Sequence, residues 1–258
     1  MADTPYIVTR GIVLRETPFR DADKILTVLS EDRGKISVLA RNLRRKRCPY
    51  AASAQPLAYS EWTLYHRGNW YYAHEGSTIE LFPGLRQELG ALSLGFYFAE
   101  LTESVSMEEV PARDLLRHLL NGLYALGTLR KPPELVKPLF ELRFLCLAGY
   151  EPLASECACC GKIDPVDPVL DPVQGVVCCG TCGGNRRGLP LGPDALAALR
   201  HAVYGDDRRL YSVRLGPEAL QRLGAAAEAF LMAQLERNFR SLEFYRSLER
   251  PGSMEKPS

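Results

Sequence analysis

Short runs of β-branched and aromatic residues, separated by polar or glycine-containing breaks, fill the beginning of the chain. Five such runs read YIVTRGIVL, KILTVLS, GKISVLA, EWTLYHR and NWYYAHEGSTIEL, with turn signals at EDRG and HRGN. Short strands in this number are typical of a small closed barrel, because closure leaves no exposed sheet edge. We predict a five-stranded OB-fold, although periodicity alone does not separate it from an SH3-like barrel.

Beyond Pro83 the apolar residues recur at helical spacing, as at Leu94, Phe98 and Leu101. This pattern predicts packed amphipathic helices, interrupted by a segment rich in proline and glycine where we expect irregular loops. The predicted fold is an α+β multidomain chain, with an all-helical domain after the barrel. Its parts are the barrel (1–82), a first helical part (83–150), a cysteine-rich segment (151–191), a second helical part (192–248) and a flexible tail (249–258).

Six of the eight cysteines stand in the stretch CACCGKIDPVDPVLDPVQGVVCCGTC. A zinc knuckle places two thiolates on a tight Cys-x-x-Cys turn, and a following glycine eases the bend. Two C-x-x-C-G units fit this pattern, and the eighteen residues between them lie within the interval typical of four-cysteine zinc sites. The predicted ligands are Cys157, Cys160, Cys179 and Cys182.

Four cysteine ligands leave no open position for water or substrate, so we expect one structural Zn²⁺ and not a catalytic metal. Cys159 and Cys178 would spoil the two-residue interval and stay outside the predicted set. Their roles remain open, as neighbours of the ligands or as thiols that hold no metal. The alternative for the whole cluster is a redox pair or buried thiols without metal.

The net charge is +1 over 258 residues, with 46% hydrophobic and 24% charged residues. These values argue against a largely disordered chain and against an overall basic one. The N-terminus lacks the regions of a secretory signal, and no segment has about 18 consecutive apolar residues. We therefore expect a soluble cytoplasmic protein, a setting in which clustered cysteines favour metal over disulfides.

A local excess of positive charge stands in ARNLRRKRCPY, and no acid lies between Asp32 and Glu61. The cations of this basic run are Arg41, Arg44, Arg45, Lys46 and Arg47. At the end of a barrel strand such a run is placed to pair with phosphates, and Lys35 at the start of the same strand extends it. The run predicts nucleic-acid binding, against the alternative of a solvated loop.

Aromatic residues near the run offer faces on which bases stack. The candidates are Phe19, Tyr50, Tyr59, Tyr65, Trp70, Tyr71 and Tyr72. Many of these rings must instead fill the barrel, and the sequence does not say which.

The sequence has no phosphate-binding loop, dinucleotide fingerprint, nucleophile elbow or H-E-x-x-H helix, so we predict a protein without enzymatic activity. Three rival functions remain. The first is an RNA-binding or translation-associated protein, and the second is a nuclease using clustered carboxylates such as Asp21 with Asp23 or Glu108 with Glu109. The third is an interaction scaffold, which the basic run disfavours.

Two strings in the chain resemble the bacterial DNA repair protein RecO family. The first is VLRETPFRDADKILTVLSEDRGKISVLARNLRR, in which Gly34, Lys35, Ala40, Arg41, Arg44 and Arg45 match the family pattern. The second is LFELRFLCLAGYEPLASECACCG, the more specific of the two. The chain departs from the pattern at Asn42, where the family usually has glycine, and at Gln174-Gly175, where it usually has a doubled glycine.

The resemblance implies an OB-fold joined to a helical domain with a zinc knuckle, in a nucleoid-associated protein. Such a protein is expected to bind single- and double-stranded DNA and to anneal complementary strands. With RecR it is expected to help load RecA onto DNA coated by single-strand-binding protein. The acidic tail of that coat protein is expected to dock on the helical domain, where the candidate cations are Arg117, Arg130, Lys137 and Arg143.

Overall fold

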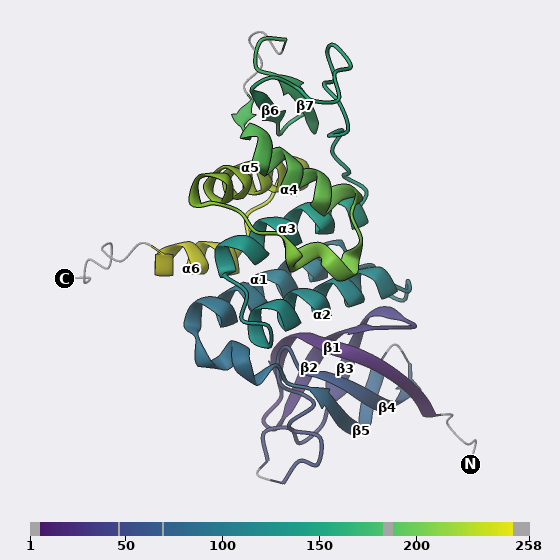
Figure 1. The fold of residues 1–258 in the computed structure, drawn as a ribbon. Helices are drawn as coiled ribbons and strands as arrows, with labels where there is room; N and C mark the ends of the chain where they lie inside the picture. Colours follow the sequence, from purple (N-terminus) through teal and green to yellow (C-terminus); the bar gives the residue numbers. More distant parts are fainter. Residues whose placement is uncertain (1–5, 46, 69, 183–187, 250–258) are drawn as a thin grey trace, which may run out of the picture. The chain divides into compact units, whose positions relative to one another are not determined.

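The computed structural model describes residues 6–45, 47–68, 70–182 and 188–249 (Figure 1). The chain forms two compact units. The first consists of Met1–Thr128 with Arg240–Ser258, and the second of Leu129–Phe239. The first unit is therefore discontinuous, because its last helix follows the whole of the second unit in sequence. No helix in this described part of the chain has both the length and the apolar character to span a membrane.

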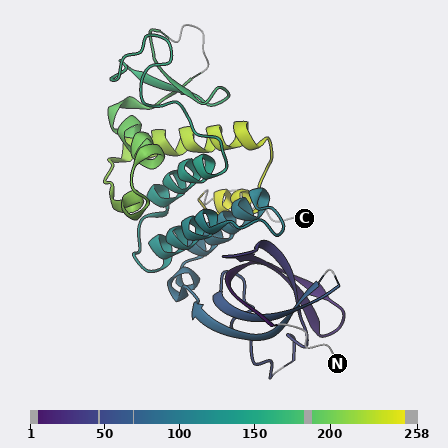
Figure 2. The same ribbon diagram turned by 90° about the vertical axis from the view of Figure 1, so that its right-hand side faces the viewer.

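A closed five-stranded barrel begins the first unit (Figure 1). Its strands are β1 (Tyr6–Phe19), β2 (Asp23–Ser30), β3 (Gly34–Ala40), β4 (Tyr59–Arg67) and β5 (Trp70–Glu80). They follow the order β1-β2-β3-β5-β4 around the barrel and appear as a ring in Figure 2. Neighbours are antiparallel except for β3 and β5, which run parallel. The predicted OB-fold is confirmed.

Alternation of side chains along the strands fills the barrel interior. In β4, Ser60, Trp62 and Leu64 are buried, and the residues between them are half-buried. Trp62 and Leu64 are fully buried and pack with residues from β1, β2, β3 and β5 in one core cluster. The strand pattern that predicted the barrel thus also identifies the residues that fill it.

Four helical segments complete the first unit, η1 (Pro83–Gln87), α1 (Leu89–Val105), α2 (Arg113–Gly127) and α6 (Arg240–Glu249). The apolar series around Leu94 and Phe98 is buried in α1, as its spacing predicted. Helix α6 packs against α1. The Glu100 carboxylate of α1 accepts hydrogen bonds from the N–H groups of Arg240 and Ser241, at 3.4 and 3.0 Å. These amides have no intrahelical partner, so Glu100 holds the start of α6 in place.

The second unit contains α3 (Pro133–Leu147), α4 (Gly192–Tyr204), η2 (Asp207–Ser212) and α5 (Pro217–Leu235). Helix α3 packs against α4 and α5. A small antiparallel sheet, in the order β7-β6-β8, stands where the sequence predicted irregular loops. Its strands are β6 (Pro168–Asp171), β7 (Val176–Cys179) and β8 (Leu189–Pro190). Strands of four residues or fewer carry no readable alternation, which is why the prediction missed them.

The turn between β2 and β3 docks on the segment between α1 and α2 through backbone contacts. The Lys35 N–H donates to the Met107 carbonyl at 3.1 Å, and the Glu109 N–H donates to the Lys35 carbonyl at 3.3 Å. Gly34 has a φ of 59°, and a Cβ there would lie 1.9 Å from the Val110 carbonyl oxygen. Gly34 is therefore needed for its left-handed conformation and also for the close approach.

Gly34→Ala is expected to destabilise the protein more than Gly68→Ala. Gly68 also has a left-handed φ, 62°, but among the described residues no atom beyond its chain neighbours lies within 4 Å of the position that a Cβ would take there. Gly68→Ala should cost about 1–2 kcal/mol for the left-handed conformation alone. Gly34→Ala should cost at least about 2 kcal/mol more, because overpacking adds to that strain. Urea unfolding followed by circular dichroism measures both, and equal losses would contradict the docking.

Candidate nucleic-acid interface and metal centre

The basic run follows β3 as a turn whose backbone is held while its cations are exposed. The exposed cations are Arg41, Arg44, Arg45 and Arg47. Lys46 lies outside the described residues. The Tyr50 hydroxyl donates to the Arg41 carbonyl at 2.7 Å, and the Arg44 N–H donates to the Ala22 carbonyl at 3.1 Å. The structure thus brings these four arginines together on one short, anchored turn.

Asn42 keeps the sharp turn that opens the run. Its φ of 56° is left-handed, a conformation that asparagine adopts more readily than most residues with a side chain. Its N–H donates to the Asp23 carboxylate at 2.8 Å. Asparagine therefore supplies here the backbone geometry for which the family pattern has glycine.

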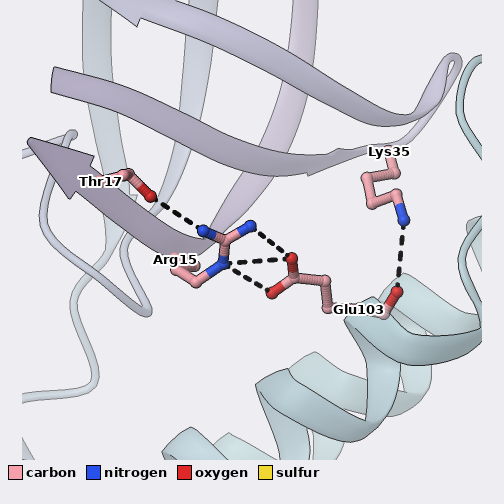
Figure 3. A network of polar contacts seen from close by, with 4 residues as sticks. All are labelled: Arg15, Thr17, Lys35 and Glu103. Atoms are coloured by element: carbon pink, nitrogen blue, oxygen red, sulfur yellow. Dashed lines mark hydrogen bonds and ion pairs between the residues drawn. The ribbon is translucent and has the colours of Figure 1, made fainter. Parts of the chain in front are cut away.

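Lys35 lies at the opposite end of β3 from the arginines. The six-residue interval between Lys35 and Arg41 corresponds to roughly 20 Å of strand. The Lys35 ammonium donates to the Glu103 carbonyl at 3.5 Å, in the last turn of α1 (Figure 3). Beside it, Arg15 and Glu103 form an ion pair of 2.9 Å (Figure 3). A cation at a helix C-terminus satisfies carbonyls that lack intrahelical partners, so Lys35 fastens β3 to α1 and does not join the arginine turn.

The candidate stacking rings divide into buried and accessible ones. Tyr50 and Tyr71 are 6% and 5% exposed and belong to the barrel core. Burial raises the pKa of Tyr50 to about 12 and also raises the pKa of Tyr71. Trp70 is 39% exposed, and the remaining candidates are half-buried. These half-buried rings are Phe19, Tyr59, Tyr65 and Tyr72.

A ladder of rings crosses the outer face of β1, β4 and β5. Tyr65 faces Tyr6 on one side and Tyr72 on the other in the strand register. The Tyr65 and Tyr72 centroids are 5.0 Å apart with an interplanar angle of 8°. Tyr6 lies 6.4 Å from Tyr65 and 4.6 Å from His74. We call Tyr6, Tyr65, Tyr72 and His74 the ring ladder.

The ring ladder meets the basic run at Arg41. The Arg41 guanidinium carbon lies 4.8 Å from the centroid of the Tyr72 ring. This contact follows from the parallel pairing of β3 and β5, which places Leu39 opposite Tyr72 and so brings Arg41 beside the same ring. Sequence reasoning missed Tyr6 and His74. The alternation of β5 puts His74 on the same face as Tyr72, but the position of Tyr6 depends on the β1–β4 register, which no local pattern shows.

A second group of rings and cations adjoins the run from the β1–β2 turn. Trp70 stacks with Phe19 at 6.4 Å and 30°, and the Arg20 guanidinium lies 5.1 Å from the Phe19 centroid. Arg44 donates from Nη1 to the Asp21 carbonyl at 3.1 Å, which joins this turn to the run. One end of the barrel therefore presents arginines directly beside aromatic faces, the combination that binds phosphates and stacks bases.

Two carboxylates of the proposed nuclease alternative are engaged in structural contacts. Asp23 accepts the Asn42 N–H at 2.8 Å, and Glu109 accepts the Tyr71 hydroxyl at 2.8 Å. Neither contact needs a metal ion or a reacting water.

The four predicted ligands gather in the second unit. The sulfur atoms of Cys157, Cys160, Cys179 and Cys182 all lie within 4.8 Å of one another. Cys160 and Cys179 are separated by 3.8 Å between sulfurs, which matches the edge of about 3.8 Å expected for a tetrahedron with 2.3 Å metal–sulfur bonds. These four cysteines are placed to bind a metal ion.

The first knuckle has the local geometry that its sequence predicts. Gly161 has a φ of 69°, and its N–H donates to the Cys157 carbonyl at 2.8 Å. The Cys179 N–H donates to the Cys157 sulfur at 3.2 Å. Backbone hydrogen bonds, first that of Cys179, lower the pKa of Cys157 to about 6, so this thiol is ready to act as a thiolate ligand. Gly183 of the second knuckle lies outside the described residues.

Cys159 and Cys178 lie beside the four ligands. Their sulfurs are 3.4 Å apart, and with Cys157 they form a second group within 4.8 Å. Cys178 is 1% exposed, whereas Cys159 is exposed. The six cysteines therefore form two overlapping sets that meet at Cys157.

Arg200 of α4 attaches the cysteine segment to the helices of the second unit. Its Nε donates to the Ala154 carbonyl at 2.7 Å, and its Nη2 donates to the Ser155 and Ile163 carbonyls. Sequence reasoning missed this residue, because an arginine on a helix has no signature that distinguishes loop anchoring from exposure.

Two of the cations considered for docking an acidic tail are engaged within the second unit. Lys137 pairs with Glu141 at 2.8 Å and with Glu228 at 2.7 Å, and its side chain is 10% exposed. Arg143 donates to the Gly205 carbonyl at 2.5 Å and pairs with Asp207 at 3.4 Å. Both side chains are largely buried and already paired, so their charges are not displayed to a ligand.

Matches to known proteins cover both the barrel and the helical part of the chain. A family model described as "Recombination protein O N terminal" matches residues 1–82, and one described as "Recombination protein O C terminal" matches residues 86–243. A protein of Acetivibrio thermocellus named "DNA repair protein RecO" is 31% identical over 95% of this chain and 98% of its own. Proteins of the same name from Heliobacterium modesticaldum and Symbiobacterium thermophilum are 33% and 31% identical, over 93% and 92% of this chain and 89% and 96% of their own.

Cys157→Ser is expected to abolish stable metal binding, because Cys157 accepts backbone hydrogen bonds and lies among all the other ligands. Since metal binding contributes directly to folding, its loss should lower the melting temperature by about 10 °C. Metal content by mass spectrometry and thermal unfolding measure the two effects. Cys48→Ser is the control, because Cys48 packs against the barrel core. A Cys157→Ser protein with wild-type metal content and melting temperature would contradict the site.

Proposed function

The chain belongs to the RecO family of DNA repair proteins, and on that premise we propose that its barrel binds single- and double-stranded DNA and anneals complementary strands. With RecR, it helps load RecA onto DNA coated by single-strand-binding protein. The protein acts by binding and carries out no bond-breaking step of its own. The observation that carries the DNA proposal is the anchored turn of exposed arginines beside the ring ladder and Trp70.

The proposed mechanism is electrostatic. Arginines on a fixed turn neutralise phosphates of two strands at one surface, which lowers their mutual repulsion and lets pairing begin. Contacts to the backbone carry no sequence information, and stacking accepts every base because each has a π face. Indifference to sequence is what annealing of arbitrary strands requires.

Arg41 has a particular place in this mechanism. Its guanidinium carbon lies 4.8 Å from the centroid of the Tyr72 ring, over the ring face on which a base would stack. A base that stacks on Tyr72 displaces the guanidinium, which then turns to a phosphate of the same strand. The cation–π contact that is lost is worth about 0.5–1 kcal/mol at an exposed position, less than a stacked base contributes.

We propose that the four-cysteine site holds one structural Zn²⁺. Four sulfurs within 4.8 Å of one another, with a backbone N–H donated to one of them, fit that ion and leave no ligand position for substrate. The ion stabilises a segment that has only short strands and little apolar core.

The partners beyond DNA are proposed on family membership. They are RecR and the acidic C-terminal tail of single-strand-binding protein. Lys137 and Arg143 are engaged within the second unit, and Arg117 pairs with Asp114 at 3.0 Å in the first. The tail proposal therefore rests on family membership and on no particular cation among the four candidates.

The triple substitution of Arg44, Arg45 and Arg47 to alanine is expected to weaken single-strand binding and slow annealing. Removing three phosphate contacts should reduce the slope of log K against log salt by about 2. The matched control replaces Arg208, Arg209 and Arg214, three exposed arginines of the second unit, with alanine. Salt titrations of both variants give the slopes, and an unchanged slope for the barrel variant would remove the run from the contact set. Competition by RNA of the same sequence tests the RNA-binding alternative, which tighter RNA binding would favour.

Tryptophan fluorescence is expected to report stacking at Trp70. The chain has two tryptophans, and Trp62 is fully buried whereas Trp70 is 39% exposed. Single-stranded DNA should quench the wild-type signal, and Trp70→Phe should remove the quenching. Trp70→Ala should also weaken binding by about 1–3 kcal/mol if one base stacks there. Phe244→Ala, at an exposed ring of α6, is the control, and quenching that persists in Trp70→Phe would argue against this contact.

A further inference from the structure

Six cysteine sulfurs gather in the second unit, yet one tetrahedral ion uses only four of them. The two overlapping sets are Cys157 with Cys160, Cys179 and Cys182, and Cys157 with Cys159 and Cys178. Within each set the sulfurs lie within 4.8 Å of one another, which is the spacing of atoms that share a metal ion.

The alternation of β7 separates the two sets. Cys178 and Cys179 are consecutive in a strand, so their side chains leave on opposite faces. Cys179 approaches Cys160 at 3.8 Å between sulfurs, whereas Cys178 approaches Cys159 at 3.4 Å. One ion therefore does not take both strand cysteines while keeping a tetrahedral arrangement.

The first knuckle is held against β7 in the register that makes this arrangement. The Ala158 N–H donates to the Val177 carbonyl at 2.9 Å, and the Cys179 N–H donates to the Cys157 sulfur at 3.2 Å. These two bonds hold the Cys157 sulfur at the edge of β7, within 4.8 Å of cysteine sulfurs from both faces of the strand. This sulfur belongs to both sets.

We propose that the second unit binds two thiophilic metal ions, with Cys157 bridging them and the second ion held also by Cys159 and Cys178. The ion is of the soft, thiolate-preferring class to which Zn²⁺ and Cd²⁺ belong. Three protein sulfurs leave its fourth position to water. The proposal rests on the four-thiolate site in one respect, the shared ligand Cys157, and it is independent of the DNA proposal.

Charge balance is compatible with a bridged pair. Coordination would turn Cys178, which is 1% exposed, into a buried thiolate, and the bound ion compensates that charge directly. Two divalent ions with six thiolates leave the same net charge as one ion with four, so the second ion adds no uncompensated charge. Each thiol that coordinates releases its proton to solvent. Because the second ion has three protein ligands and one exchangeable water, whereas the first has four protein ligands, the second ion should exchange faster.

Native mass spectrometry of the full chain tests the proposal with Zn²⁺ as the probe. Reduced protein, freed of metal by a chelator, is titrated with Zn²⁺ to saturation. We expect two Zn²⁺ per chain for the wild type, with the second released first when chelator is added back. Cys159→Ser and Cys178→Ser should each bind one, and retention of that ion shows that the variants are folded. Cys48→Ser, which removes a thiol of the first unit, should bind two.

Cadmium-113 NMR gives a second readout of the same question. The wild type should show two resonances and Cys178→Ser one. A single Zn²⁺ and a single resonance in the wild type, unchanged in both variants, would overturn the second site while leaving the four-cysteine site intact. No bound Zn²⁺ in the wild type would overturn both sites. The two failures are therefore distinguishable.

Discussion

The parallel pairing of β3 with β5 is the contact on which the candidate interface depends. It closes the barrel, since without it β3 and β5 would each present an open edge. The same pairing places Leu39 opposite Tyr72 and so delivers Arg41 to the ring ladder. One set of backbone hydrogen bonds thus brings cations from one loop and rings from three strands to a single surface.

The proposed metal centre has a separate role, the stabilisation of the cysteine segment in the second unit. The segment around β6 and β7 has strands of four residues, too little material to stabilise itself by burial. Thiolate bonds to the proposed metal ion would replace that missing core, and Arg200 fastens the segment to α4 through three carbonyls. The residues proposed to bind DNA all belong to the first unit, so loss of metal and loss of DNA contacts are separable effects.

The sequence was most informative where a requirement is local. The alternation in EWTLYHR identified β4 and its buried Trp62, and the two C-x-x-C-G units identified four cysteines that do gather. It was least informative where a role depends on partners far along the chain. Lys35 begins the strand that leads to the arginines but contacts α1 through the Glu103 carbonyl, and Lys137 is paired with Glu228, which is distant in sequence. Tyr6 lies beside Tyr65 because of the register between β1 and β4. Tyr71 is buried in the core because the barrel is closed.

The central claim is that single-stranded DNA lies on the barrel across the arginine turn and the exposed rings. Photo-crosslinking of the full protein to a single-stranded oligonucleotide, followed by peptide mass spectrometry, tests it most directly. The account predicts crosslinks in the peptides that carry Tyr6, Tyr72 and Trp70, with attachment suppressed by high salt. Crosslinks confined to the helices of the second unit, with the barrel peptides unmodified, would contradict it.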